Sequence, residues 1–333
     1  MMESGDSLLS ADTVPRVLAE LGVFASSVPV EVEELTGGVS SAVFRATAGS
    51  VSVVVKQALP QLKVAQTWKA DTARSSVERA AAELLNTILA GRVPACIAAD
   101  AKRHLFVMEA VAAQGTWKDQ LLAGDIDLSL ARSAGDLLGT IHRQTRNDPE
   151  LVARFGDKRM FHELRLDPYL RSVAAVHPSV NDIVSILIEG LLASNECLVH
   201  ADFSPKNLLV TPENDLILVD HEVAHVGDPS FDIAFLLTHL TAKALHDRVH
   251  SGQLCDAMSA FVDSYGAAAD WPEASSRTPR LLAAIMLARV DGKSPLEYLT
   301  ATSAATIRSI ALELLREPAA TLEDHIDLIR RWQ

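Results

Sequence analysis

The first third of the chain alternates apolar and polar positions in short runs. Three of these runs are rich in β-branched residues and are separated by turns that contain glycine; they cover residues 30–35, 42–44 and 51–55. Such runs are typical of antiparallel strands, and we therefore predict a three-stranded meander. We predict a helix over Asp12–Leu21 before the meander and another over Arg74–Ala90 after it. Residues 93–101 are predicted to form a loop that leads to a strand at Leu105–Met108.

Helical periodicity replaces this alternation from Asp125 onward. Apolar residues that recur every three to four positions indicate a helix with one buried face. Six segments show this pattern: residues 128–144, 181–194, 231–248, 254–265, 280–290 and 302–316. One short β segment, Leu198–Asp220, lies among them, and residues 145–180 show no clear pattern. We therefore predict an α+β fold with a small β-rich lobe over residues 1–108 and a larger helical lobe over residues 109–333.

Composition narrows the class of protein. The 333 residues are 48% hydrophobic and 22% charged, which fits a globular protein long enough for two cores. The net charge of −13 argues against binding to nucleic acid or to anionic membranes, because both need clustered lysine and arginine. It fits solubility alone or a cationic substrate. The polar, acidic first ten residues and the shortness of the apolar stretch Leu281–Val290 predict neither a signal peptide nor a membrane span, so we expect a cytoplasmic protein.

A polar loop between two apolar runs carries the strongest chemical signal. It begins at His200 and contains Asp202 and Asn207, and Asp220 ends the next apolar run. Phosphoryl transfer needs a carboxylate that orients the attacking hydroxyl and oxygen ligands for Mg²⁺. The spacing His-x-Asp-x-x-x-x-Asn, followed by an aspartate on a strand, is that of kinase catalytic and metal-binding loops. We predict Asp202 as the catalytic carboxylate and Asn207 and Asp220 as metal ligands; the alternative is a turn whose backbone these side chains cap.

A lysine upstream predicts a nucleotide site. Lys56 closes the third predicted strand, where a lysine can hold the α- and β-phosphates of ATP. A glutamate on the following helix usually aims such a lysine, and Glu78 and Glu83 are both candidates. The alternative for a lysine at a strand end is an ordinary solvated side chain.

Two further motifs are predicted to support this chemistry. The turn that contains Gly37, Gly38 and Ser40 offers backbone N–H groups that can cover phosphates, although a plain hairpin turn explains the same residues. Asp232 opens a strongly apolar helix, where a carboxylate is favoured by the helix dipole. We interpret Asp232, together with His200, as structural support for the catalytic loop.

These motifs together resemble the aminoglycoside phosphotransferase superfamily, which contains relatives of choline kinase. The resemblance is carried by His200–Asn207, Asp220–Glu222 and Gly227–Asp232, and it is closest to the methylthioribose kinase branch. It covers roughly residues 12–315. It implies a protein-kinase-like fold of two lobes, with ATP and Mg²⁺ as cofactors and a hydroxyl group of a small molecule as the phosphoryl acceptor.

The resemblance also implies roles for individual residues. The branch has an arginine four positions before the helix glutamate, here Arg74 and Glu78, which favours Glu78 as the partner of the lysine. An Asp-x-Glu sequence stands where protein kinases have Asp-Phe-Gly, which implies that Asp220 and Glu222 both approach Mg²⁺. The segment that ends at Glu109 resembles the hinge, whose backbone binds adenine.

Departures from the branch concern the catalytic loop and the acceptor. Ala201 stands where glycine is usual, a minor change if its backbone is α or β. Of two adjacent arginines that hold the sugar in methylthioribose kinase, only Arg289 remains, and Asp291 adds a negative charge nearby. A carboxylate near the acceptor would suit an ammonium group, although Asp291 equally fits the cap of the turn before Gly292.

The predicted function is ATP-dependent phosphorylation of a hydroxyl on a small metabolite. The acceptor we expect is an amino alcohol, such as aminopropanol, ethanolamine or choline, or an amino sugar. Homoserine, methylthioribose and aminoglycoside antibiotics are alternative acceptors, and an inactive nucleotide-binding pseudokinase is the alternative that is not an enzyme. Residues 221–231 are too few for the peptide-binding activation segment of a protein kinase. The oligomeric state stays open.

Overall fold

The computed structural model describes residues 8–35, 40–61 and 71–332 of the chain. The chain divides into two compact units, which are described separately below. Unit 1 contains residues 1–112 and 219–222, and unit 2 contains residues 113–218 and 223–333. The lobe boundary expected between residues 108 and 109 stays a prediction.

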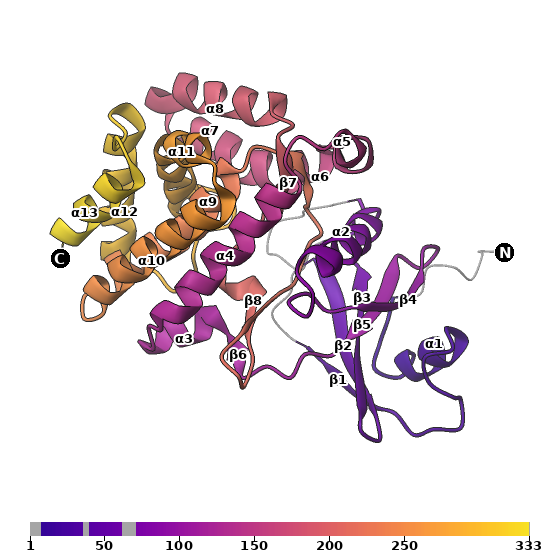
Figure 1. Cartoon of the computed structure of the whole chain (residues 1–333). Helices are drawn as coiled ribbons and strands as arrows, with labels where there is room; N and C mark the ends of the chain where they lie inside the picture. The colour runs from indigo at the N-terminus through magenta and orange to yellow at the C-terminus, as the bar shows by residue number, and fades with distance from the viewer. Residues whose placement is uncertain (1–7, 36–39, 62–70, 333) are drawn as a thin grey trace. The chain divides into compact units, whose positions relative to one another are not determined.

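Unit 1 is built on a five-stranded antiparallel sheet with the strand order β1-β2-β3-β5-β4 (Figure 1). The predicted meander is confirmed as β1, β2 and β3. The loop predicted over residues 93–101 is wrong in part, because Cys96–Asp100 forms the edge strand β4; its small residues give little strand signal, and pairing with β5 orders them. The strands are β1 (Glu31–Glu34), β2 (Ser41–Ala48), β3 (Val51–Ala58), β4 (Cys96–Asp100) and β5 (Leu105–Glu109).

The two faces of this sheet have different neighbours. Phe44 and Val55 point to the face that packs in a common core with α1 (Val14–Glu20). Side chains alternate along a strand, so Lys56 points to the opposite face. There α2 (Arg74–Ile88) packs against β3, β4 and β5. Both helices confirm the prediction, and the face under α2 receives the charged residues of the candidate site.

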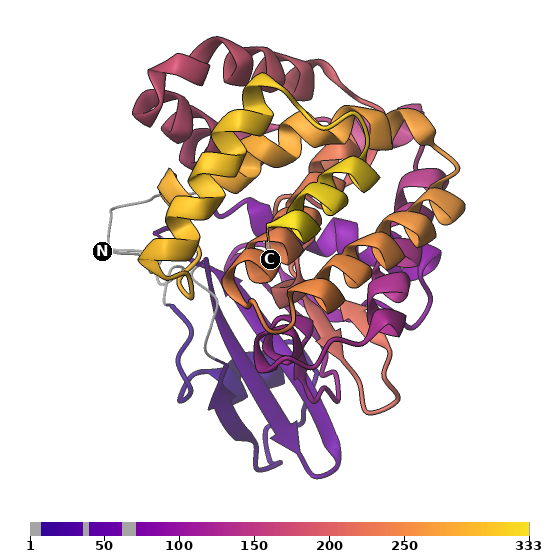
Figure 2. The ribbon, with the colours of Figure 1, turned by 90° about the vertical axis from the view of Figure 1, so that its left-hand side faces the viewer.

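Unit 2 is mostly helical, and α9 (Ser230–His246) is its core helix. Every residue of α9 from Ser230 to Leu245 is buried, as expected for a helix that is enclosed by others. The helices α10, α11 and α12 contact α9, and α12 lies beside α11 (Figure 2). Helix α4 packs tightly along α10, since a Cβ atom at Gly135 would lie 2.5 Å from the carbonyl oxygen of Phe261.

Unit 2 also contains two small antiparallel sheets, β7 with β10 and β6-β8-β9. Its helices are α3 (Trp117–Ala123), α4 (Leu128–Gln144), α5 (Pro149–Phe155), α6 (Arg159–Phe161), the π-helix η1 (His162–Arg171), α7 (Ser172–Val176), the 3₁₀ turn η2 (Pro178–Val180), α8 (Asn181–Ala193), the 3₁₀ turn η3 (Pro205–Asn207), α9 (Ser230–His246), α10 (Ser251–Ala269), α11 (Pro272–Asp291), α12 (Ala301–Arg316) and α13 (Leu322–Arg331). Its strands are β6 (Gly115–Thr116), β7 (Cys197–Val199), β8 (Leu208–Val210), β9 (Leu216–Leu218) and β10 (His225–Gly227).

All six helices predicted for the second part of the chain are present, and the α+β class is confirmed. Helices α10 and α11 are longer than predicted, and α13 follows the last predicted helix. The segment without a clear pattern contains the π-helix η1, with Pro168 inside it. Proline has no N–H group for the regular ladder, which is one reason that ordinary helical periodicity is absent there.

No single helix in the described ranges is long and apolar enough to cross a membrane. One strongly bent pair, Arg159–Val176 with Pro178–Ala193, passes the same test of length and composition when its two parts are taken together.

Candidate active site

The charged centre of unit 1 is Lys56 on β3. Its ammonium group donates hydrogen bonds to Glu78 Oε1 on α2, at 2.6 Å, and to Asp220 Oδ1, at 2.5 Å. Lys56 and Glu78 are both buried. The structure therefore brings together three residues that lie far apart in the sequence, and it pairs the lysine with Glu78. Glu83 instead pairs with Arg79, at 2.5 Å, on the exposed side of the helix.

The carboxylates around Lys56 hold it in its charged form. Burial opposes the charge, but attraction to Asp220 and then to Glu78 and Glu222 outweighs it, so the pKa of Lys56 is raised above its ordinary value. Burial raises the pKa of Glu78 to about 7, and repulsion from Asp220 and Glu222 adds to the effect, while Lys56 lowers it. The cluster thus has more negative than positive side chains within a small space.

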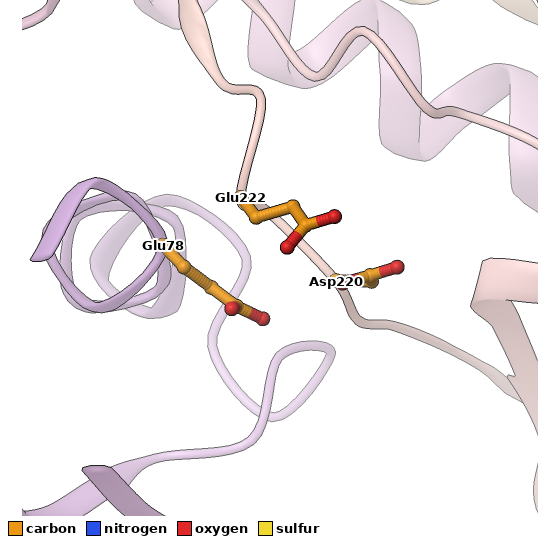
Figure 3. A group of neighbouring side chains, drawn as sticks. All are labelled: Glu78, Asp220 and Glu222. Atoms are coloured by element: carbon orange, nitrogen blue, oxygen red, sulfur yellow. The ribbon is translucent and has the colours of Figure 1, made fainter. Parts of the chain in front are cut away.

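Glu78, Asp220 and Glu222 form a group that fits a divalent cation. One carboxylate oxygen of each lies within 4.8 Å of the others, and their side chains converge from α2 and from the segment after β9 (Figure 3). Carboxylate oxygens are the ligands that Mg²⁺ prefers. The donor set therefore fits the magnesium site that the resemblance implies for Asp220 and Glu222, with Glu78 engaged by Lys56.

Arg74 is a site residue that the sequence brought in only as part of a pattern. Its Nε donates to Glu222 Oε2 at 3.1 Å, and its Nη2 donates to the carbonyl oxygens of Ser40 at 2.5 Å and Leu59 at 2.6 Å. The side chain is fully buried. Arg74 therefore fixes the orientation of Glu222, and the signal for it was its position four residues before Glu78.

The predicted phosphate turn and hinge are only partly visible. Gly37 and Gly38 lie outside the described residues. Ser40 is buried, and its carbonyl oxygen accepts the bond from Arg74. Glu109 ends β5, and its N–H donates to the carbonyl oxygen of Ala95 at 3.0 Å. The roles expected for these residues toward the nucleotide stay predictions.

In unit 2, the loop between β7 and β8 carries the predicted catalytic residues. Asn207 lies in the 3₁₀ turn η3 and donates its Nδ2 to Asp202 Oδ2 at 2.8 Å and to the Asp202 carbonyl oxygen at 2.9 Å. The amide of Asp202 donates to His200 Nδ1 at 3.2 Å. Asn207 thereby fixes the orientation of the Asp202 carboxylate.

Two cations that the sequence reasoning missed contact Asp202. Arg165 Nη2 lies 3.1 Å from Asp202 Oδ1, and Lys206 Nζ lies 2.9 Å from Asp202 Oδ2. Arg165 also donates its Nε to the carbonyl oxygen of Ala201 at 2.5 Å. Lys206 was present inside the motif, but Arg165 lies on the π-helix η1, where no sequence pattern pointed to it.

Asp232 is tied to the backbone of the catalytic loop. Its two carboxylate oxygens accept hydrogen bonds from the amides of His200 and Ala201, both at 2.7 Å. His142 Nε2 lies 3.4 Å from Asp232 Oδ2, and its Nδ1 lies 3.0 Å from the hydroxyl of Tyr265. Asp232 therefore links the start of α9 to the backbone of the catalytic loop.

The backbone of Ala201 corrects one expectation. Its φ is +60°, in the left-handed region and in neither the α nor the β region. Glycine adopts this conformation without strain, whereas alanine brings its Cβ close to the backbone. Alanine in place of the usual glycine is therefore not a minor change. The hydrogen bonds that Ala201 donates to Asp232 and accepts from Arg165 hold the strained conformation.

The two residues expected near the acceptor both have protein partners. Asp291 accepts two bonds from Arg308, at 2.7 and 2.6 Å, and contacts His177 Nε2 at 2.7 Å. The bond from Arg308 holds the pKa of Asp291 below its ordinary value. Arg289 is buried and donates its Nη1 to the hydroxyl of Tyr169 at 3.1 Å and to Ser294.

Together these features define a class of protein. A buried lysine on the sheet is paired with a helix glutamate, a carboxylate cluster follows β9, and an aspartate–asparagine loop lies in a helical unit; this set is that of a kinase-like phosphotransferase. Residues 31–275 match the phosphotransferase enzyme family. The chain belongs to this family, and the resemblance inferred from its sequence is confirmed.

Known relatives agree with this assignment. The 4-hydroxytryptamine kinase of Psilocybe cubensis is 24% identical over 241 residues, which are 62% of the chain and 66% of that kinase. The methylthioribose kinase of Bacillus cereus strain AH820 is 23% identical over 266 residues, which are 71% of the chain and 67% of that kinase. The matches thus span about two thirds of the length of these relatives.

A solved structure shares the fold. The ethanolamine kinase of Plasmodium vivax superposes with a TM-score of 0.59, over 91% of the chain and 88% of that protein, at 11% sequence identity. The kinase-like fold is therefore confirmed.

Proposed function

We propose that the protein is an ATP-dependent kinase that phosphorylates a hydroxyl group of a small molecule. The observation that carries this proposal is the position of Asp202 in the loop between β7 and β8, where Asn207, Arg165 and Lys206 contact its carboxylate. Phosphoryl transfer needs such a fixed carboxylate to accept or orient the proton of the attacking hydroxyl. The proposed reaction is a phosphoryl transfer, which is the type of reaction that names the family.

Residues 1–108 are proposed to bind the nucleotide. Lys56, aimed by Glu78, neutralises charge on the phosphates, and backbone groups of Gly37, Gly38 and Ser40 cover them. The backbone at Glu109 binds the adenine. Each of these roles rests on the resemblance, and the Lys56–Glu78 pair supports it directly.

Asp220, Glu222 and Asn207 are proposed to hold magnesium. Arg74 orients Glu222 for this task. The ion supplies positive charge that offsets the developing charge on the phosphate oxygens. The donor atoms are the hard oxygens that this ion requires.

Residues 109–333 are proposed to bind the acceptor, and Asp202 takes the proton from its hydroxyl. His200 and Asp232 position this loop without touching the acceptor. The sequence favoured an amino alcohol or an amino sugar, and the name of the 4-hydroxytryptamine kinase supports an acceptor that bears an amine. Methylthioribose is a second candidate, because a methylthioribose kinase is also among the relatives.

A coupled assay of ADP release tests this function. Purified protein with Mg²⁺ and ATP is presented with amino alcohols, choline, homoserine, methylthioribose and aminoglycosides. We expect turnover on at least one of them, and we expect Asp202→Asn to lower kcat by roughly 10²- to 10⁴-fold while nucleotide binding is retained. Asp263→Asn, an exposed change on α10, is the matched control. Full activity of Asp202→Asn would show that another residue is the base.

A further inference from the structure

A buried lysine without a hydrogen-bond partner lies on the core helix of unit 2. Lys243 on α9 is 1% exposed, and its Nζ has no hydrogen-bond partner among the described residues. Its Nζ lies 4.9 Å from the centroid of the Tyr298 ring, over the ring face. An ammonium group that is removed from water without a compensating bond costs stability. A residue that is kept at such a cost requires an explanation.

Three further polar groups around Lys243 have atoms that lack a partner. They are His239 Nε2, Arg289 Nε and the hydroxyl of Tyr298, each of them buried and without a hydrogen bond in the described parts of the chain. His239 precedes Lys243 by one helical turn, so both lie on one side of α9. We call Lys243, His239, Arg289 and Tyr298 the α9 basic cluster.

Basic groups outnumber carboxylates among the charged residues that act on Lys243. Burial lowers the pKa of Lys243 to about 7, and the positive charges of Lys118 and Arg289 add to this effect. Burial and the charges of Arg289 and Lys243 hold the pKa of His239 well below its ordinary range. Glu297 is the carboxylate that acts on Lys243, and it already forms an ion pair with Lys118. An anion beside Lys243 and His239 would favour their protonated forms, so the free groups of the cluster are suited to an anion.

The cluster is continuous with the catalytic loop inside unit 2. The ring of His239 lies 5.4 Å from that of Phe235, and the guanidinium carbon of Arg165 lies 5.7 Å from the Phe235 ring. Arg165 in turn contacts Asp202 at 3.1 Å. A second route runs from Arg289 to the hydroxyl of Tyr169, at 3.1 Å, and its ring lies 5.8 Å from Arg165. Packed side chains of unit 2 thus connect the cluster with Asp202, and Lys206, which contacts Asp202, also acts electrostatically on His239.

We propose that the α9 basic cluster binds an anionic group, a carboxylate or a phosphate, of the acceptor whose hydroxyl faces Asp202. The acceptor class is then a small hydroxy acid, a hydroxy amino acid or a phosphorylated polyol, and of these the hydroxy amino acid also carries the amine that is proposed above. A plain amino alcohol would leave the buried donors unsatisfied, at a cost in affinity. This inference rests on the proposed kinase function and names its acceptor class.

Matched acceptors test the proposal in the ADP-release assay. β-Hydroxypropionate and glycerol phosphate carry the two kinds of anion, aminopropanol carries only an amine, and homoserine carries both an amine and a carboxylate. We expect turnover with at least one anionic compound and expect Lys243→Met to raise its KM by roughly tenfold to a hundredfold, with a smaller change in kcat, because a charge-assisted hydrogen bond is lost. Arg280→Met, an exposed change on α11, is the control that should leave KM unchanged. Turnover confined to aminopropanol would overturn the proposal.

A binding measurement separates the proposal from the kinase function. The thermal midpoint of the protein is followed with acetate or inorganic phosphate at constant ionic strength, with chloride as the reference salt. We expect one of the two anions to raise the midpoint of the wild type and of Arg280→Met but not of Lys243→Met. That result supports the anion site even if no acceptor is turned over, in which case only the kinase proposal fails. Equal responses of all three proteins would refute the anion site, whatever the activity.

Discussion

At the scale of single residues, the backbone of the catalytic loop is held in a conformation that its sequence does not favour. Ala201 in this loop has a φ of +60°, and Asp220, in the segment after β9, has a φ of +70°. Aspartate tolerates this region because its short polar side chain can bond locally, whereas alanine has no such compensation. The bonds of Ala201 to Asp232 and Arg165 therefore offset a strain that a glycine would not have.

Replacing this alanine tests the strain. We expect Ala201→Gly to stabilise the fold by about 0.5–1 kcal/mol, because removal of Cβ relieves about 1–2 kcal/mol of left-handed strain and added freedom of the unfolded chain offsets part of it. The measurement is the free energy of unfolding in urea. Ala201→Val should have the opposite effect, since β-branched residues fit this region worst. A loss of stability in Ala201→Gly would show that the strain is not there.

At the scale of elements, the start of α9 fixes the catalytic loop. The carboxylate of Asp232 receives two backbone N–H groups from the loop, one on each oxygen. His142 on α4 and Tyr265 on α10 extend the network behind it. Three helices thereby define where the loop that carries Asp202 lies, and Asp232 is a positioning residue.

The Asp232→Asn variant tests this positioning role. An amide offers one acceptor oxygen, so one loop N–H would face an NH₂ group instead. We expect a loss of about 1–3 kcal/mol in unfolding free energy and a lower kcat, while the dissociation constant of the nucleotide changes little. The exposed variant Asp263→Asn again serves as the control. If kcat and stability both stayed at the wild-type level, the bonds to Asp232 would have no part in holding the loop.

At the scale of the whole molecule, net charge and local charge point in opposite directions. The chain carries a net charge of −13, which suited a cationic substrate, yet the α9 basic cluster contains buried, unpartnered basic groups that would suit an anion. Net charge describes solubility and long-range attraction, and it does not describe a buried pocket. We expect the unfolding free energy of the whole protein to depend on the charge of one buried side chain, that of Lys243.

The pH dependence of stability reports that charge. The pKa of Lys243 falls from 10.5 to about 7 on folding, so between these values the unfolded state binds more protons. The unfolding free energy of the wild type should therefore rise relative to that of Lys243→Met as pH increases from about 7 to 10.5. Below about pH 7 the full cost of the buried charge is present, and Lys243→Met should be the more stable protein. Parallel pH profiles of the two proteins would contradict this.

The neighbours of Lys243 with shifted pKa values do not change their protonation state within this pH range. His239 stays neutral because its pKa is held well below its ordinary range. Glu297, whose pKa is lowered, stays ionised beside Lys118, and Tyr298, whose pKa is raised, stays protonated. The difference between the two profiles therefore reports Lys243 itself.

The sequence by itself determined the class of fold, the family and the spacing of the motifs. Alternation and helical periodicity are local properties, so the meander and six helices could be predicted, and the spacing from His200 to Asn207 lies within one loop. The pairing of Lys56 with Glu78 was also predicted. The two residues are far apart in the sequence, and the resemblance to a known family indicated that they meet.

Only the tertiary structure decided which distant charges meet. Arg165 lies on a π-helix without readable periodicity, far before Asp202 in the sequence, and Arg74 contacts Glu222 from the other half of the sequence. The negative charge of Asp291 suggested a residue that binds the acceptor, but its carboxylate contacts Arg308 and His177. In the sequence, Lys243 cannot be told from an exposed lysine on a helix, and only the structure shows that it is buried. Charge, burial and partners depend on what folding places side by side, and no local pattern encodes them.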